Sequence, residues 1–153
     1  MTILSAPEKL FGGNSCMGIV YAELILTNIE DMGLLRRSYI KEEQVRKMKV
    51  NSLVDSGAYM LVIPEHVKLQ LGLEVVEQRE VELADGKTNL CDVVGPVEIR
   101  FANRRAVSNA FVMGNEVLLG AIPMEELDVV IDTRNQKLIV NPENPTMPKM
   151  KIK

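Results

Sequence analysis

The residues of this 153-residue chain that are best suited to chemistry are Asp55, Ser56 and Gly57, within VNSLVDSGAYMLVIPE (50–65). Asp55 follows apolar strand-forming residues, which lower the local dielectric and make an uncompensated carboxylate costly. The Ser56 hydroxyl can donate and accept hydrogen bonds, and Gly57 lets another backbone approach closely. A carboxylate in this setting needs a partner.

A second carboxyl group at hydrogen-bond distance would be such a partner. Two facing carboxyl groups share one proton, because like charges so close together cannot both be ionised. The pair can hold a water molecule, accept a proton from it, and protonate the nitrogen that leaves an amide bond. This chemistry needs no metal, no other cofactor and no covalent intermediate.

The second carboxyl group cannot come from another triplet of this kind in the same chain. Asp132-Thr133 is followed by Arg134, and no other aspartate precedes Ser or Thr and then Gly. We therefore expect the partner to be Asp55 of another copy, because an isologous dimer places identical groups face to face across its two-fold axis. This hypothesis predicts a homodimer and an inactive monomer.

The segments on either side of Asp55 predict strands. In RKMKVNSLV (46–54), polar and apolar side chains alternate, which is typical of a half-buried strand running into Asp55. LVI (61–63) predicts a short strand after it. Pro64 at a first-turn position and Gly72 as the stop then outline a brief helix over 64–71.

Turn signals separate further strands at the spacing of about 8–12 residues that is typical of a compact all-β fold. MGIVYAELILTN (17–28) has the composition of a strand buried on both faces, and 28–43 is a long connection with at most a short helix. Asp85-Gly86 suits the positive φ angles of a tight hairpin. The C-terminal third predicts a helix beginning at Pro123, a hairpin over 129–140 and a loose tail.

Several of these segments together resemble a known family. They are LVDSGA (53–58), the hairpin tip ADG (84–86), and VLLG (117–120) with a short helix after it, within LLGAIPMEELDVVID…LIVNP (118–142). The chain is similar to the single-lobe retropepsin-like aspartic proteases, and more narrowly to a small bacterial, archaeal and cyanobacterial branch. The resemblance covers about residues 17–142, between an N-terminal extension (1–16) and a tail containing Pro and Lys (143–153).

The resemblance implies an all-β, retropepsin-like acid protease barrel with one or two short helices. In it, Asp55 would be the catalytic acid and base, and Ser56 would make a hydrogen bond between subunits. The other implied roles are loop support at Gly57 and Ala58, a substrate-binding flap (81–92) with Ala84, Asp85 and Gly86 at its tip, and a strand behind the loop at Leu118, Leu119 and Gly120.

Two positions depart from the retroviral pattern. Retroviral members usually carry an acid directly after the first motif and an arginine directly after the apolar-apolar-glycine, and the two form an internal ion pair. Here these positions hold Tyr59 and Ala121, so this ion pair is absent.

Composition excludes several other classes of function. A net charge of −3, with basic residues that alternate with acidic or apolar ones, predicts no nucleic-acid partner. Cys16, Cys91 and the single histidine, His66, cannot form a usual zinc site; we expect reduced, apolar cysteines and a surface histidine. The absence of a signal peptide and of an apolar run of ~18 residues predicts a cytoplasmic protein that does not enter a membrane.

The leading hypothesis is an aspartic endopeptidase that binds an extended peptide or protein substrate between the flaps and the dyad. The main alternative is a peptide-binding or dimerisation module that keeps the fold without turnover. A third is a scaffold whose apolar strands bind an unknown partner. The sequence leaves all three open, because Asp55 would look the same in each.

Overall fold

Strands dominate the computed structural model, which describes residues 2–3 and 18–152. They are β1 (Thr2–Ile3), β2 (Tyr21–Asn28), β3 (Lys47–Val54), β4 (Leu61–Ile63), β5 (Val75–Leu83), β6 (Thr88–Phe101), β7 (Arg104–Val112), β8 (Leu118–Leu119), β9 (Val129–Asp132) and β10 (Lys137–Val140). The helices are α2 (Ile29–Arg36), α3 (Glu65–Leu71) and α4 (Ala121–Leu127), with a 3-10 turn η2 at Glu42–Gln44. The all-β class is confirmed, although three short α-helices are present where one or two were expected.

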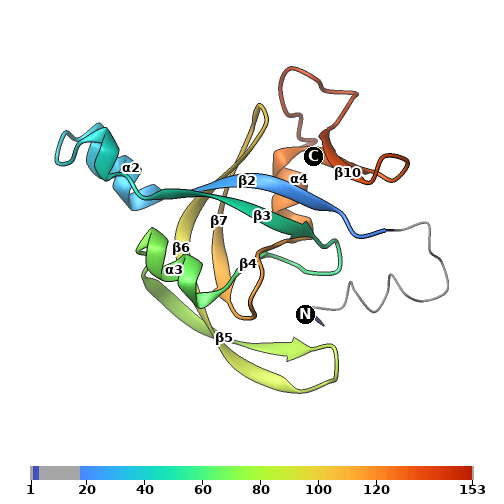
Figure 1. The fold of residues 1–153 in the computed structure, drawn as a ribbon, viewed down its shortest axis with the longest axis horizontal. Helices are drawn as coiled ribbons and strands as arrows, with labels where there is room; N and C mark the ends of the chain where they lie inside the picture. Colours follow the sequence, from blue (N-terminus) through green and yellow to red (C-terminus); the bar gives the residue numbers. More distant parts are fainter. Residues whose placement is uncertain (1, 4–17, 153) are drawn as a thin grey trace.

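The main sheet has the order β1-β5-β6-β2-β3-β8-β4-β7, and β7 also pairs with β6. The pairings therefore return to β6, so that β6, β2, β3, β8, β4 and β7 form a ring (Figure 1). The first half of β6 pairs with β5, and these two strands project from the ring as an arm. β9 and β10 form a separate two-stranded sheet.

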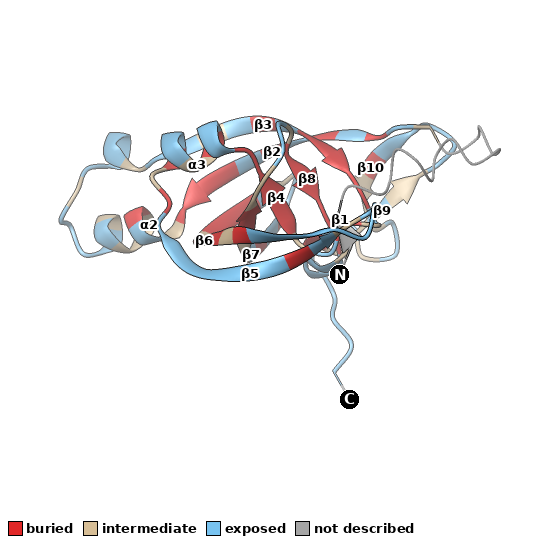
Figure 2. Ribbon diagram, turned by 90° about the horizontal axis from the view of Figure 1, so that it is seen from below, coloured by how far each residue is buried: buried red, intermediate tan, exposed pale blue. Residues whose placement is uncertain are grey.

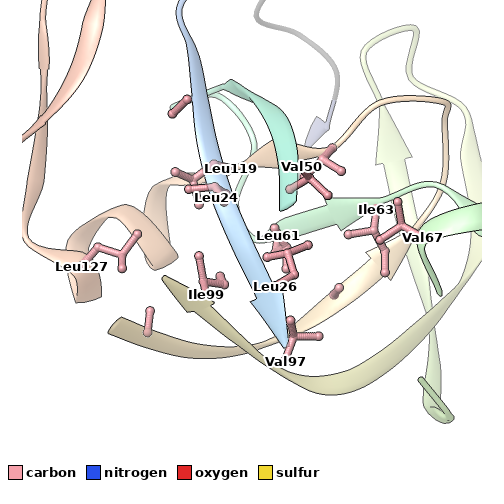
Figure 3. Close-up of a cluster of buried hydrophobic side chains, with 14 of the residues drawn as sticks. Leu24, Leu26, Val50, Leu61, Ile63, Val67, Val97, Ile99, Leu119 and Leu127 are labelled. Carbon is pink, nitrogen blue, oxygen red and sulfur yellow. The ribbon is translucent and has the colours of Figure 1, made fainter. Parts of the chain in front are cut away.

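The main hydrophobic core lies within the ring. Leu24 and Leu26 of β2 are fully buried there, together with residues of β4, β6 and β8 (Figure 3). Full burial of such a side chain contributes about 1.5–3 kcal/mol. The prediction that β2 is buried on both faces was wrong, because Tyr21 and Ile25 are 45% and 40% exposed. The ribbon of β2 accordingly carries both buried and exposed residues (Figure 2).

A second core cluster joins the arm to the strands that position Asp55. It contains Val81 of β5 and Cys91 of β6, and it is completed by Leu53, Val62, Val93, Phe111 and Leu118. Cys91 is a buried free thiol, as expected, and burial raises its pKa. Cys16 lies outside the described residues.

The helices near the site begin close to the predicted positions. α3 starts at Glu65, with Pro64 as its N-cap residue, and ends at Gly72, whose φ of 63° is the left-handed conformation that favours glycine. α4 begins at Ala121 and not at Pro123, because proline is tolerated within the first turn of a helix. None of the helices in the described part of the chain is long and apolar enough to span a membrane.

The predicted loose tail is instead bonded to the end of α4. The Asp128 carboxylate accepts hydrogen bonds from the Asn141 and Asn144 side chains and from the Lys149 backbone N–H. The prediction failed because residues rich in proline and lysine resemble a solvated linker, whereas the hydrogen-bond partners of the tail lie 16 to 42 residues earlier in the chain.

Candidate active site

Asp55 lies where three short strands meet. β8 runs parallel to β3, with Leu53 opposite Leu118, and antiparallel to β4. The loop that carries Asp55 therefore leaves β3 on one side of β8 and returns as β4 on the other. The Asp55 N–H donates to the Leu119 carbonyl at 3.0 Å, so Leu118 and Leu119 lie directly behind the loop.

Gly120 allows the chain after β8 to pass close to this loop. A Cβ atom at position 120 would lie 2.3 Å from the Met60 carbonyl oxygen and 2.8 Å from the Met60 nitrogen. Both are backbone atoms, which cannot move aside as the end of a long side chain can. The next two N–H groups, of Ala121 and Ile122, donate to the Ala58 and Tyr59 carbonyls at 2.9 and 3.1 Å.

The two carboxylate oxygens of Asp55 have different surroundings. Oδ1 accepts hydrogen bonds from the Gly57 and Ala58 N–H groups at 2.8 and 3.2 Å, as is typical of an aspartate in a turn. Oδ2 has no hydrogen-bond partner, although Asp55 is only 1% exposed. Among the described residues, it is the one buried carboxylate oxygen in this condition, and leaving such an acceptor unsatisfied costs about 1–3 kcal/mol.

After Asp55, the loop changes from exposed to buried over three residues. Ser56 is exposed, Gly57 is half-buried and Ala58 is buried. Two large apolar side chains beside this loop are also exposed, Tyr59 at 51% and Ile122 at 39%. The surface around the catalytic candidate therefore combines a hydroxyl group with apolar side chains.

The predicted hairpin over 81–92 is present as the end of the arm formed by β5 and β6. The Gly86 N–H donates to the Leu83 carbonyl at 2.9 Å, and the Lys87 N–H donates to Asp85 Oδ1 at 2.9 Å. Gly86 has a φ of 86°, whereas Asp85 has no positive φ. The tip is thus a turn closed by a left-handed glycine rather than a hairpin with two positive φ angles.

Ala84, Asp85 and Gly86 are exposed, and no hydrogen bond within the described residues joins this tip to Asp55. The base of this hairpin is linked to β3, the strand before Asp55, in another way. Val81 and Cys91 pack in the same cluster as Leu53, which lies two residues before Asp55.

A polar hollow that sequence reasoning did not predict lies along β3. It has a volume of about 510 Å³, and Tyr21, Lys49, His66 and Glu116 are among its lining residues. The Tyr21 hydroxyl donates to Glu116 Oε1 at 2.6 Å, and this hydrogen bond raises the pKa of Tyr21. The available signal was the position of Glu116 directly before the VLLG motif. His66 is exposed, as expected.

Metal ligands do not gather anywhere in the part of the chain that the structure describes: no group of three or more His, Cys, Asp or Glu residues there could hold a metal ion. The carboxylate of Asp55 is buried and accepts hydrogen bonds from two backbone N–H groups. The chemistry available here is that of a buried carboxyl group.

No family model and no curated protein matches the chain by sequence. Solved structures do match. The retroviral protease-like domain of Ddi1 from Leishmania major has 13% identity and a TM-score of 0.50, over 82% of this chain and 91% of that one.

Two further structures match less well. A retropepsin-like aspartic protease from Rickettsia conorii has 13% identity and a TM-score of 0.41, over 75% of this chain and 88% of that one. The protein Lpg0085 of unknown function from Legionella pneumophila has 10% identity and a TM-score of 0.38, over 72% and 85%. The Ddi1 domain, together with the crossing of β8 between β3 and β4, shows that the chain has the retropepsin-like fold.

Proposed function

We propose that this protein is an aspartic endopeptidase whose catalytic pair consists of Asp55 from each of two identical copies. The observation that carries the proposal is the unequal bonding of the Asp55 carboxylate: Oδ1 is held by two backbone N–H groups, and Oδ2 has no partner. A second carboxyl group that shares one proton with Asp55 would satisfy Oδ2, and because this oxygen is buried in the single copy, the loop must shift on dimerisation for the two groups to meet.

The surface beside Asp55 supports a second copy as the source of that group. Ser56 directly follows the buried aspartate and is exposed, as are the apolar side chains of Tyr59 and Ile122. A two-fold axis at this surface would cover the apolar side chains and bring the two Ser56 hydroxyl groups together. The match to a protease-like domain adds support from the fold alone.

The reaction follows from one proton shared by two carboxyl groups. The ionised group accepts a proton from a bound water, and the water oxygen forms a bond to the amide carbon of the substrate. The protonated group gives its proton to the amide nitrogen as the carbon–nitrogen bond breaks. The proton taken from the water replaces the one given up, so the pair returns to its starting state.

The substrate class that we propose is an extended peptide or protein segment. The arm formed by β5 and β6 presents an exposed turn at Ala84, Asp85 and Gly86, and among the described residues the 88–92 part of β6 pairs with no strand other than β5. An extended peptide pairs with the backbone groups of such a strand edge as an added strand does. Recognition would then depend mainly on main-chain hydrogen bonds.

The test compares the wild-type protein with Asp55→Asn on a mixed peptide library at mildly acidic pH. Asn keeps the size of the side chain and the acceptor at Oδ1 but cannot act as a base. We expect cleavage to fall by at least about 100-fold. The matched control is Asp132→Asn in the turn between β9 and β10, where the carboxylate bonds only to its own turn, and this variant should cleave normally.

Equal cleavage by the wild type and Asp55→Asn would reject the dyad. If neither protein cleaves but both bind peptides, the result would support the alternative of a catalytically silent peptide-binding module with this fold. Binding measured by fluorescence anisotropy on the same library separates these outcomes.

A further inference from the structure

Helix α4 is attached to the catalytic loop at its N-terminal end. The Ala121 and Ile122 N–H groups donate to the carbonyls of Ala58 and Tyr59, which follow Asp55 in the same loop. α4 spans Ala121–Leu127, so it is about 10 Å long. If so short a helix rotated, its first turn would displace the Ala58 and Tyr59 carbonyls to which it is bonded. The loop therefore keeps its position only if the C-terminal end of α4 is fixed as well.

The other end of α4 is fixed by Asp128. This residue ends the helix with a φ of 54°, a left-handed conformation that aspartate tolerates better than most residues. Its carboxylate accepts hydrogen bonds from Asn141 Nδ2 at 3.0 Å, Asn144 Nδ2 at 2.8 Å and the Lys149 N–H at 3.0 Å. These donors, Asn141 first, hold the pKa of Asp128 below its ordinary value.

A buried arginine completes the arrangement. Arg104, at the start of β7, is fully buried; its Nη2 donates to the Asn144 carbonyl and lies 3.9 Å from Asp128 Oδ2. Nε and Nη1 of Arg104 have no partner among the described residues. Because a buried cation is costly without a nearby negative charge, Asp128 and Arg104 depend on each other.

Two further hydrogen bonds connect the same parts of the chain. Asn103 Nδ2 donates to the Pro145 carbonyl at 3.0 Å, and the Val107 N–H of β7 donates to Glu126 Oε2 of α4 at 2.9 Å. The tail therefore joins the C-terminal end of α4 to the turn between β6 and β7. These contacts fix α4 to the ring at the end opposite the catalytic loop.

We propose that Asp128 is a positioning residue of the active site, a role that rests on the function proposed above. Asp128 fixes α4 through the tail and Arg104, and α4 in turn holds the loop that carries Asp55. In this chain Tyr59 and Ala121 cannot form an ion pair between the loop and the start of the helix. The contacts of Asp128 provide an equivalent restraint at the opposite end of the helix.

The test is the variant Asp128→Asn, studied first without substrate. The substitution replaces one carboxylate oxygen with an NH₂ group, which is itself a donor and faces the donors of Asn141, Asn144 and Lys149. The C-terminal end of α4 should therefore loosen. We expect hydrogen exchange of the Ala121 and Ile122 amides to become faster by about tenfold, whereas the Asn28 amide, bonded to Arg46 at the far end of β2, should be unchanged. In peptide cleavage, kcat should fall and KM should stay the same.

Asp132→Asn is the matched control, because it removes a carboxylate that also accepts three hydrogen bonds, all within its own turn. Ala121 and Ile122 should exchange normally in that variant. If Asp128→Asn does not fold, Asn144→Ala removes one donor while keeping both charges, and it should give a smaller effect in the same direction.

Unchanged exchange at Ala121 and Ile122 in Asp128→Asn would overturn the proposal. So would an equal acceleration at Asn28, because it would mean that Asp128 stabilises the whole domain without positioning the loop. An inactive wild-type protein would contradict the proposed function, but the exchange measurement would still test whether Asp128 acts on the loop through α4.

Discussion

At the scale of single residues, the site depends on Asp55 and Gly120. Asp55 uses one oxygen to shape its own turn and leaves the other without a partner in a buried position. Gly120 has no Cβ atom, which allows the chain after β8 to pass close to the loop that carries Asp55. An unsatisfied buried acceptor is destabilising, and its persistence in a well-packed region is typical of a functional site.

Gly120→Ala tests the close passage. The added Cβ would lie 2.3 Å from a backbone oxygen of Met60, so the loop or the helix must shift. We expect the free energy of unfolding to fall by about 1–3 kcal/mol and cleavage to be lost. Gly33→Ala is the control: its Cβ would meet only the end of the Arg36 side chain at 3.7 Å, and alanine favours the helix by up to ~1 kcal/mol. Urea denaturation of both variants gives the comparison, and equal stability would contradict the account.

At the scale of elements, the site is the point where β8 enters between β3 and β4. The second core cluster extends this arrangement to the arm, because Val81 of β5 packs with Leu53 and Leu118. The proposed flap is thus attached to β3 and β8 at its base and exposed at its tip. Its exposed strands have few buried contacts, which is typical of a segment that opens locally.

Val81→Ala tests the attachment of the flap. Val81 is fully buried, and loss of its two methyl groups should destabilise the domain by about 1–2 kcal/mol and raise KM for peptides. Val76→Ala on the same strand is the control, because Val76 is 52% exposed and should be close to neutral. An unchanged KM in Val81→Ala would show that the cluster does not restrain the flap.

The contact between α2 and the start of β3 predicts a pH dependence of stability. Asp31 accepts two side-chain hydrogen bonds from Arg46, and these lower the pKa of Asp31 below 3.8. A carboxyl group whose pKa is lower in the folded state stabilises above its unfolded-state value, and this contribution is lost as the pH falls through the folded-state value.

We therefore expect the wild type to lose stability below about pH 4 more steeply than Asp31→Asn. The difference at neutral pH should be modest, about 1 kcal/mol, because the Arg46 side chain is 51% exposed. Thermal denaturation between pH 3 and 7 measures both slopes. Parallel curves would show that this ion pair is not coupled to folding.

The sequence predicted the parts of the fold that depend on local patterns. The alternation over 47–52 in β3, the turn with Gly86, and the Gly72 stop of α3 all follow from neighbouring residues. It failed where distant contacts decide. Tyr21 and Ile25 are apolar on an outer face, and the tail is held by Asp128 and Arg104, neither of which its own composition indicates.

At the scale of the whole molecule, the described residues of one copy supply a ring of strands, a β5–β6 arm and a single buried carboxyl group with an unpartnered oxygen. The proposed chemistry needs two such groups, so the assembly is part of the mechanism. Light scattering should find a dimer at tens of micromolar. A stable monomer at that concentration would contradict a shared proton in the absence of substrate.

The most direct test is a crystal structure of the assembled protein, in which the distance between the Asp55 carboxyl oxygens of the two copies is measured. A proton shared between the two groups requires an oxygen–oxygen distance of about 2.5–3.0 Å across a two-fold axis, with a water molecule bound to both groups. Two Asp55 side chains that face away from each other, each without a carboxyl partner, would contradict the proposed enzyme while leaving the fold intact.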